Sequence, residues 1–509
     1  MYIMKSIYNK VSLLGAAFLI LQLLFPACTN ELDQYPHVEK TGKDIYTSVD
    51  NYQQVLAKLY GSFVMAGQDK GGGNTDISGS RGFDYMRCYF NLQELGTDEA
   101  AMVWHASDNQ TGLSYLSWDE NDVWVYDTYY RIYYTIALCN EFIRNATDDK
   151  IGTFSESEQQ ELRSMRAEAR FLRALAYSHA LDLFRDIPFV DESSPVGTYC
   201  PPKHTAQQIY DYIVSELSDV AKALPQHPEY PRAGAAAAYG ILARVYLNAE
   251  TYGVGKHYDE CVQACKAIFD MGYKTLEPKF TRLFGADNHK CTDEILFAFA
   301  VDNENSVSWG ASTYIVCSQC YSAFGDKLGV GTQSWGIMRC RSQIPALFDG
   351  TEGDSRNLFY TEDREAKITD LSDDKVGYFY MKWNNLNDEG RAPVKTTDGV
   401  CTDLPIIRLA DVYLMLAECY LRGASNVTQA EALAAVNTVR ERAYGNSNGN
   451  IQASDLNLDF IIKERGREFA IEMLRRTDLV RFDMFTTDKY LWDFKGGMPD
   501  GTAVDSKYN

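Results

Sequence analysis

Two stretches of the chain repeat one pattern, in which apolar and small residues recur at helical spacing on both sides of a turn that contains glycine. In residues 233–272, Ala243 lies before the turn, and in residues 411–443, Ala417 lies before Gly423. This is the layout of a tetratricopeptide-like hairpin, where small residues allow two helices to approach closely. Such a pair cannot bury its apolar face alone, so further helices must stack on it. The pattern predicts a mostly α fold built on a helical-repeat scaffold.

A long segment of different character separates the two hairpins. Residues 276–405 are rich in glycine, aromatic and polar residues, and the stretch 309–336 shows no helical period. The sequence EILFAFAV at 294–301 is typical of a short strand. We therefore expect a helical scaffold over about 36–275 and 406–509, which carries a loop-rich, ligand-binding insertion with short strands over about 276–405.

One long helix is expected to carry a row of arginines. Apolar residues recur every three or four positions over 162–183, which predicts a helix with one buried stripe. Arg163, Arg166, Arg170 and Arg173 follow the same spacing on another face. Like charges at this spacing repel by about 0.2–0.5 kcal/mol per pair. We therefore expect acidic side chains on a neighbouring helix, with a solvated basic face as the alternative.

The N-terminus has the features of an export signal. Lys5 and Lys10 precede an almost unbroken apolar run over 11–25, which is too short to span a bilayer comfortably. The run is followed by a Pro-Ala-Cys sequence that ends at Cys28. We expect residues 1–27 to be a lipoprotein signal peptide, with Cys28 as the lipid-bearing first residue of a mature domain. An ordinary signal peptide and an uncleaved membrane anchor are the alternatives.

Charge and motifs exclude several classes of function. The formal net charge of −21 argues against a nucleic-acid ligand, since phosphate recognition requires an excess of Lys and Arg. The chain contains no HExxH or GxSxG motif, no P-loop, and no GxGxxG between a strand and a helix. Residues 302–306 offer oxygen ligands but lack the glycine and closing glutamate of an EF-hand. We predict no catalytic residue, no metal and no cofactor.

Aromatic residues in non-helical segments are the candidate binding residues. A sugar ring has apolar C–H faces that stack on an indole or a phenol, while polar side chains hold its hydroxyl groups. Four aromatic residues lie in glycine-rich or polar stretches that are expected to be loops. They are Trp104, Trp309, Tyr314 and Trp335.

The order of several segments resembles the SusD/RagB family of nutrient-binding outer-membrane lipoproteins. The resemblance covers nearly the whole chain and rests on five segments together with the start CTNELDQYP. The segments are MRAEARFLRALAYSHALDLFRDIPFV, AAYGILARVYLNAE, PIIRLADVYLMLAECYLRG, VNTVRERA and KERGREFAIEMLRRTDLVRF.

The resemblance implies a tetratricopeptide-like scaffold that carries a less regular ligand-binding region. It implies that residues 28–509 form one SusD-like domain, anchored by lipid to the outer membrane and facing the cell exterior. It also implies a partner, a SusC-like TonB-dependent transporter, over which such proteins act as a lid. The segment around Trp104 matches a ligand-facing region of the family, whereas Trp309, Tyr314 and Trp335 match by region only.

The C-terminal motif departs from the usual family form. Where the family often has Glu-Gly-x-Arg-Trp, residues 472–476 read EMLRR, which keeps the Glu and an Arg. Glu468, Glu472, Arg475 and Asp478 are spaced to fall on one face of a single helix, where they would form a structural ladder of ion pairs.

The expected function is capture of a glycan, most simply an oligosaccharide, at the cell surface and its delivery to an outer-membrane transporter, without catalysis. Two other classes remain open at this stage. An acidic helical glycoside hydrolase would release sugar, because two carboxylates distant in sequence can meet in space. A tetratricopeptide-type adaptor would bind a peptide in a helical groove.

Overall fold

The computed structural model describes residues 42–69, 71, 74–77, 83–197, 199–393 and 399–502. The expected signal peptide and Cys28 lie outside these residues. By its contacts the chain divides into one unit that ends at Asn51 and a second that begins at Tyr52. The described part of the first unit holds α2 (Gly42–Ile45) and the start of α3 (Val49–Val64). All that follows concerns the second unit.

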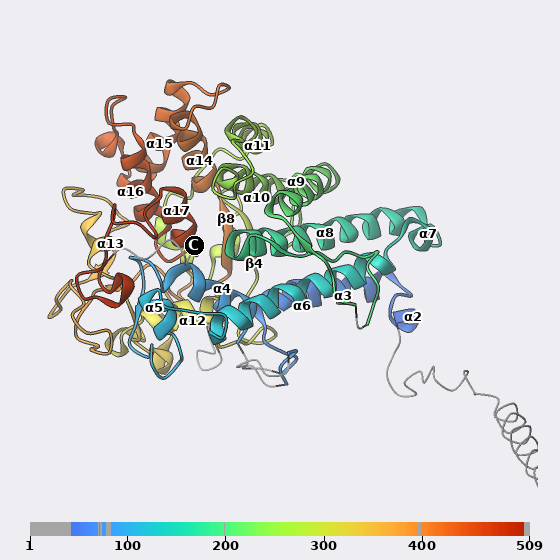
Figure 1. Ribbon diagram of the computed structural model, residues 1–509, viewed down its shortest axis with the longest axis horizontal. Coiled ribbons are helices and arrows are strands. Elements are labelled where there is room, and N and C mark those ends of the chain that lie inside the picture. The colour runs from blue at the N-terminus through green and yellow to red at the C-terminus, as the bar shows by residue number, and fades with distance from the viewer. Residues whose placement is uncertain are drawn as a thin grey trace, which may run out of the picture. The chain divides into compact units, whose positions relative to one another are not determined.

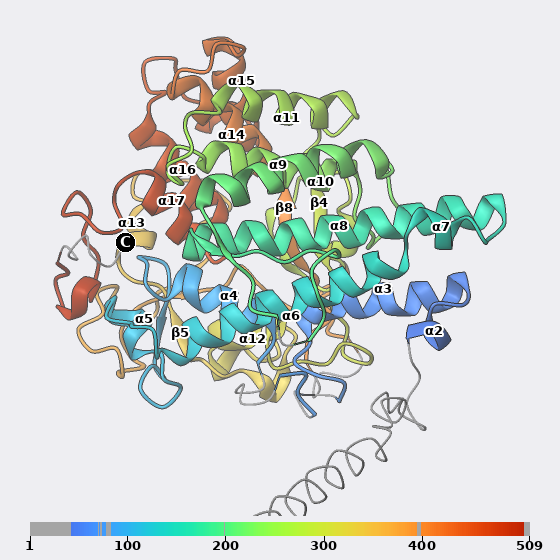
Figure 2. The same ribbon diagram turned by 45° about the vertical axis from the view of Figure 1, so that its right-hand side comes forward.

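Antiparallel helices, each packed on the next, form the scaffold of this unit. In the stack, α6 packs on α8, and α8, α9, α10 and α11 follow in order, with α14 and α15 continuing beyond α11 (Figures 1 and 2). The helices are α6 (Val123–Asn145), α8 (Glu156–Phe184), α9 (Ala206–Ala223), α10 (Ala235–Asn248), α11 (Tyr258–Asp270), α14 (Leu409–Leu421) and α15 (Gln429–Tyr444). The predicted helical-repeat scaffold is confirmed.

The two predicted hairpins are α10–α11 and α14–α15, and small residues lie at their contacts. Ala243 and Ala417 are both fully buried. The Cys261 thiol on α11 donates to the carbonyl oxygen of Ala243 on α10 at 3.2 Å, so the two helices approach closely there. Gly423 ends α14 with φ +97°, a conformation that glycine adopts without strain.

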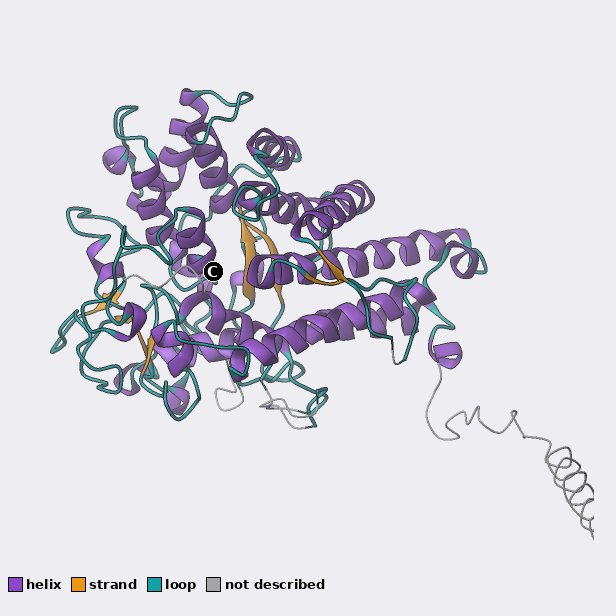
Figure 3. Ribbon diagram, viewed as in Figure 1, coloured by secondary structure: helices purple, strands orange, loops and turns teal. Residues whose placement is uncertain are grey.

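A fully buried two-stranded ribbon marks both ends of the insertion. The predicted strand at 294–301 is β4 (Ile295–Phe299), and it pairs antiparallel with β8 (Leu404–Arg408), which leads directly into α14. The chain between the two strands is mostly turns and loops, which Figure 3 shows gathered away from the stacked helices. The ribbon thus fixes both ends of this irregular region against the scaffold.

The stretch 309–336 is not entirely irregular, contrary to expectation. It contains the helix α12 (Ala311–Gln319), in which every residue is buried. A helix that is buried on all sides needs no polar face, so its sequence shows no amphipathic period. The absence of periodicity was therefore a sign of complete burial and not of a loop.

Shorter elements complete the unit. The helices are α4 (Tyr85–Glu94), α5 (Thr111–Tyr115), α7 (Asp148–Ile151), α13 (Gln343–Ala346), α16 (Leu458–Phe469) and α17 (Arg475–Arg481). The strand pairs are β1 (Ala101–Met102) with β5 (Met338–Arg339), β2 (Ile187–Pro188) with β3 (Lys203–His204), and β6 (Phe359–Tyr360) with β7 (Phe379–Tyr380). Short 3-10 turns lie at Phe280–Phe284, Asn288–Lys290, Ser322–Phe324, Gly331–Gln333, Ser447–Gly449 and Lys495–Gly497. Within the described residues, no helix combines the length and apolarity that a membrane span requires.

The arginine row of α8 meets acidic residues, as expected. Arg170 forms a bidentate pair with Glu216 of α9, at 2.9 and 3.0 Å. Arg173 bonds the same Glu216 and also Glu192, and Arg166 pairs with Asp148 at 2.9 Å. The prediction of an acidic neighbouring helix is confirmed.

The expected ladder on one C-terminal helix is wrong in its geometry. The helix is interrupted after Phe469, since Ile471 and Met473 have φ of +64° and +63°, and α17 begins only at Arg475. The four charged residues are all buried and paired, but with other partners. Glu468 and Glu472 bind Arg408, Arg475 binds Asp98, and Asp478 binds Arg465 and Arg481.

Candidate functional site

Two of the four predicted aromatic residues lie in contact. The ring centroids of Trp309 and Trp335 are 6.4 Å apart, with the ring planes tilted by 53°. Trp309 is exposed and Trp335 is half-buried. The Trp335 N–H donates to the carbonyl oxygen of Cys317 at 2.9 Å, which ties its backbone to the end of α12. Two indoles 26 residues apart in sequence, at positions 309 and 335, thus share one surface.

The short sheet of β1 and β5 brings Trp104 to the same region. Met102 pairs with Met338, and the N–H of Val103 donates to the carbonyl oxygen of Ile337 at 2.8 Å. The strands are antiparallel, so the chain leaving β1 toward Trp104 and the chain entering β5 from Trp335 lie at the same end of the sheet. Trp104 is 49% exposed there. Three tryptophans from two distant loop regions therefore converge on one end of this sheet.

Arg87 of α4 forms hydrogen bonds to the loop that holds Trp309 and to the loop that holds Trp104. Its guanidinium donates to the carbonyl oxygen of Trp309 at 2.9 Å and to the Asp108 carboxylate at 3.1 Å. The Asp108 N–H in turn donates to the carbonyl oxygen of Trp104 at 2.9 Å. Arg87 is itself buried, so these bonds are shielded from water. The side chain therefore holds the backbones of two of the tryptophans in a fixed relation.

Gly71 lies against the edge of the Trp309 ring. Its N–H donates to the carbonyl oxygen of Val307 at 3.1 Å, and its φ is +66°. A Cβ atom added at this position would lie 2.7 Å from Nε1 of Trp309, which is closer than such contacts allow. The position of the indole thus depends on the absence of a side chain at residue 71.

Tyr314 does not face a ligand, contrary to the prediction. It lies within α12 and is fully buried. Its hydroxyl donates to Asn91 Oδ1 at 3.0 Å and accepts from Gln110 Nε2 at 3.2 Å, while the Arg87 guanidinium lies 4.1 Å from its ring centroid. Burial raises its pKa to about 12. Tyr314 instead packs against Arg87, which donates to the carbonyl oxygen of Trp309.

The sequence reasoning missed Tyr321, which lies beside this surface. It follows the end of α12, is 37% exposed, and stacks on Phe379 with ring centroids 5.5 Å apart. A Cβ atom added at Gly336 would lie 3.4 Å from the Tyr321 Cα atom, so the tyrosine adjoins the residue after Trp335. The end of α12 could not be recognised in the sequence, because the helix is buried on all sides and shows no apolar period. Tyr321, which follows that end, was therefore not selected.

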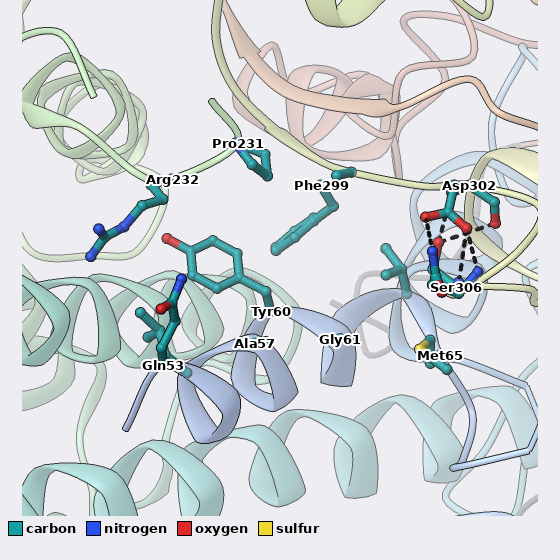
Figure 4. Close-up of a pocket in the computed structure, with 14 residues that line it drawn as sticks. Gln53, Ala57, Tyr60, Gly61, Met65, Pro231, Arg232, Phe299, Asp302 and Ser306 are labelled. Carbon is teal, nitrogen blue, oxygen red and sulfur yellow. Dashed lines mark hydrogen bonds between the residues drawn. The ribbon is translucent and has the colours of Figure 1, made fainter. Parts of the chain in front are cut away.

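A further cavity lies elsewhere and contains none of the four predicted residues. It has a volume of about 470 Å³ and lies between α3, the segment at Pro231, and the chain that follows β4 (Figure 4). Tyr60 and Phe299 form its aromatic wall, and Asp302 and Ser306 lie at one side. Its surface is mainly apolar, and several of its polar groups are already bonded: Tyr60 and Arg232 bind Glu168, and Asp302 binds its own loop.

The side-chain oxygens at 302–306 that could have bound calcium take part in hydrogen bonds within their own loop. Asp302 Oδ1 accepts from the backbone N–H groups of Glu304, Asn305 and Ser306. The part of the chain that the structure describes holds no cluster of three or more His, Cys, Asp or Glu side chains suited to a metal ion.

A stack of helical hairpins that displays tryptophans on its loops defines the protein as a scaffold-type binding protein. Comparison with known sequences makes the class specific. Residues 351–508 match the family described as "SusD family", and residues 43–247 match the family described as "Starch-binding associating with outer membrane". The chain is 30% identical to the starch-binding protein SusD of Bacteroides thetaiotaomicron, over 99% of this chain and 96% of that protein. The chain therefore belongs to the SusD family.

Other relatives agree with this assignment. A SusD-like protein of Bacteroides ovatus is 24% identical over 92% of this chain and 82% of its own length. Among solved structures, surface glycan-binding protein A from Bacteroides uniformis superposes with a TM-score of 0.68 at 21% identity, covering 90% of this chain and 95% of that one. At this identity the likeness shows the fold alone. The descriptions of the SusD relative and of the matching family both name binding of starch.

Proposed function

We propose that this protein binds a glycan at the surface formed by Trp104, Trp309 and Trp335. The observation that carries the proposal is the ring pair of Trp309 and Trp335, with the backbone at Trp104 lying at the same end of the β1–β5 sheet. The ring planes of this pair are tilted by 53°, so the two indoles do not form one flat platform.

The surface is suited to moderate and reversible binding. Each indole offers an apolar face to the C–H groups of one sugar, and partial exposure keeps the site hydrated. The loss of one indole should therefore cost about 1–3 kcal/mol of binding free energy. The supports of the site, Arg87 and Tyr314, are buried and belong to helices, so the surface is formed before the ligand arrives.

The relatives indicate which ligand to test first. Because the SusD protein of Bacteroides thetaiotaomicron is described as starch-binding, starch oligosaccharides are the first candidates. A glycan array probed with residues 28–509 tests this choice against other glycans. Signal from α-glucans or from another glycan class supports the proposal and identifies the ligand, whereas an array without signal contradicts it.

The proposal extends to location and partner. We propose that residues 28–509 form one domain that Cys28 anchors by lipid to the outer membrane, facing the cell exterior. More than one acyl chain makes such anchoring stable, since each buried methylene contributes about 0.8 kcal/mol. A matching family is described as associating with the outer membrane, which supports this location. The bound glycan would then pass to a SusC-like TonB-dependent transporter, over which the protein acts as a lid. Co-purification of the transporter with the tagged lipoprotein from membranes tests the partner.

A further inference from the structure

Two arginines from distant parts of the chain line a second cavity, apart from the tryptophan surface. The cavity has a volume of about 410 Å³ and lies where the end of α8, the turn after α10 and the region of α17 meet. Its charged and polar lining residues are Asp182, Arg185, Thr251, Arg476, Asp483 and Thr486. This volume is within the ordinary range for small-molecule sites.

The charge of Arg476 is only partly neutralised. Its Nη1 lies 3.4 Å from Oδ2 of Asp182, and this is its one ion pair among the described residues. The same carboxylate oxygen already accepts from Gln93 Nε2 at 3.0 Å and from Thr477 Oγ1 at 2.8 Å. Burial lowers the pKa of Arg476, the charge of Asp182 opposes this, and repulsion from the charge of Arg185 lowers the pKa further. A second anion would relieve this repulsion.

Arg185 has no carboxylate within 4.0 Å in the described part of the chain. Its Nη1 donates to the carbonyl oxygens of Leu181 and Asp182, at 3.2 and 3.0 Å, and its guanidinium lies 4.8 Å from the ring centroid of Tyr252. The backbone of Arg185 has φ +63° and ψ −93°, which a residue with a side chain rarely adopts. Such strain persists where the surroundings hold a residue in place, and it often marks a functional position.

The remaining charges at the cavity do not cancel this excess. Asp483 lies at the rim, but it is exposed and pairs with Nζ of Lys489. Two guanidinium groups thus face the single carboxylate of Asp182, since Asp483 and Lys489 neutralise each other. When Lys489 is counted beside Asp483, three cationic side chains at the cavity face two carboxylates, in a chain whose formal charge is −21.

We propose that the cavity formed by Arg185, Arg476, Thr251 and Thr486 binds an oxyanion group of a small ligand. A carboxylate, sulfate or phosphate group matches the planar fork of a guanidinium, which can donate two parallel hydrogen bonds to it. The threonine hydroxyls add donors beside this position. The site does not depend on the tryptophan surface, so it would give the protein a second binding specificity, for an anionic ligand.

Isothermal titration of the full mature protein tests the proposal. Inorganic sulfate, inorganic phosphate and glucuronate are the probes, glucose is the neutral control, and ionic strength is held constant with chloride. Saturable binding of at least one anion is expected, and the sulfate, phosphate and glucuronate arms distinguish a free ion from an acidic sugar. Arg476→Gln and Arg185→Gly should each weaken this binding at least about tenfold, as expected for a charge-assisted hydrogen bond.

Arg163→Gln is the matched control, because it removes the same charge from an exposed site on α8. Arg185→Gly should fold, since glycine adopts the backbone angles of residue 185 without strain. The proposal is wrong if the parent protein binds none of the three anions saturably. It is equally wrong if both site variants bind as tightly as the Arg163→Gln variant.

Discussion

At the scale of single residues, the proposed glycan site depends on the exposure of a few aromatic side chains and on the atoms that pack against them. Trp104, Trp309 and Trp335 could be selected from the sequence because tryptophans in loops are unusual and stack well on sugars. Tyr314 was selected by the same reasoning, yet it is buried, because the sequence did not reveal α12. The type of residue in the site could thus be predicted from the sequence. The exposure of Tyr314 could not, because the buried helix α12 shows no periodic pattern of apolar residues.

The contact between Gly71 and Trp309 gives a prediction at this scale. Gly71→Ala should weaken glycan binding several-fold, because the new methyl group would displace the indole from its position. Gly390→Ala is the matched control, since Gly390 has a similar φ of +73° but nothing within 4 Å of an added Cβ. Both variants should lose about 1–2 kcal/mol of stability from the unfavourable φ. Titration calorimetry that finds equal glycan affinity in both variants would show that the indole position is irrelevant.

At the scale of elements, helix type and order were predictable and helix ends were not. The hairpins α10–α11 and α14–α15 follow from spacing and small residues. The sequence did not predict the break between α16 and α17, because the charged residues from Glu468 to Asp478 have the spacing of one continuous helical face. After the break, Arg475 pairs with Asp98, a partner more than 370 residues away in sequence, and no local pattern encodes such a contact.

The close contact at Ala417 gives a prediction for α14. Ala417→Leu should lower the free energy of unfolding by about 1–3 kcal/mol, because the fully buried site has no room for three more carbon atoms. Ala434→Leu on α15 is the matched control, since Ala434 is exposed. Urea denaturation measures both. An unchanged midpoint for Ala417→Leu would mean that the helix pairing is misplaced.

The buried ion pairs of α14 and α16 predict a loss of stability in acid. Burial alone would raise the pKa of Glu468, but the charges of Arg442, Arg408 and Arg356 lower it to about 2. Burial likewise opposes the charge of Arg481 at Glu418, whose pKa is also lowered to about 2. A carboxyl group whose pKa is lower in the folded than in the unfolded state stabilises the fold above the unfolded value, near 4.5. This contribution is lost as the pH falls from about 4.5 toward 2.

The urea midpoint should therefore fall steeply between pH 4.5 and pH 2 and change little between pH 5 and pH 6. Glu418→Gln should already be destabilised at pH 6, by about 3–5 kcal/mol, since it breaks a buried ion pair and leaves Arg481 with Asp478 as its remaining carboxylate partner. A midpoint that stays constant down to pH 2 would contradict the pairing.

At the scale of the whole molecule, the sequence predicted the scaffold and the family, whereas the packing of the chain determines the site. The three tryptophans lie in segments separated by the entire α6–α11 stack, and β1 pairing with β5 brings those segments together. Two residues per strand carry too little signal to predict such a pairing. The second cavity could not be predicted from the sequence either, because Arg185 and Arg476 come together only in the folded chain.

The proposed anchor belongs to this scale, because it would determine where the proposed binding surface acts. Cys28→Ala should release the protein from the membrane fraction, because Cys28 is the residue proposed to carry the lipid. Cys200→Ala is the control, because Cys200 is an exposed free cysteine within the fold. Equal membrane fractionation of the two variants would refute lipid attachment at residue 28.

The most direct test of the account is calorimetric titration of a starch oligosaccharide, or of the glycan that the array identifies, into Trp309→Ala and Trp335→Ala. Tyr199→Ala is the control, since Tyr199 is 42% exposed but lies outside the tryptophan surface. The account predicts that each tryptophan variant keeps the unfolding temperature of the parent and binds about tenfold more weakly or worse, with Tyr199→Ala unchanged. Parental affinity in both tryptophan variants would contradict it.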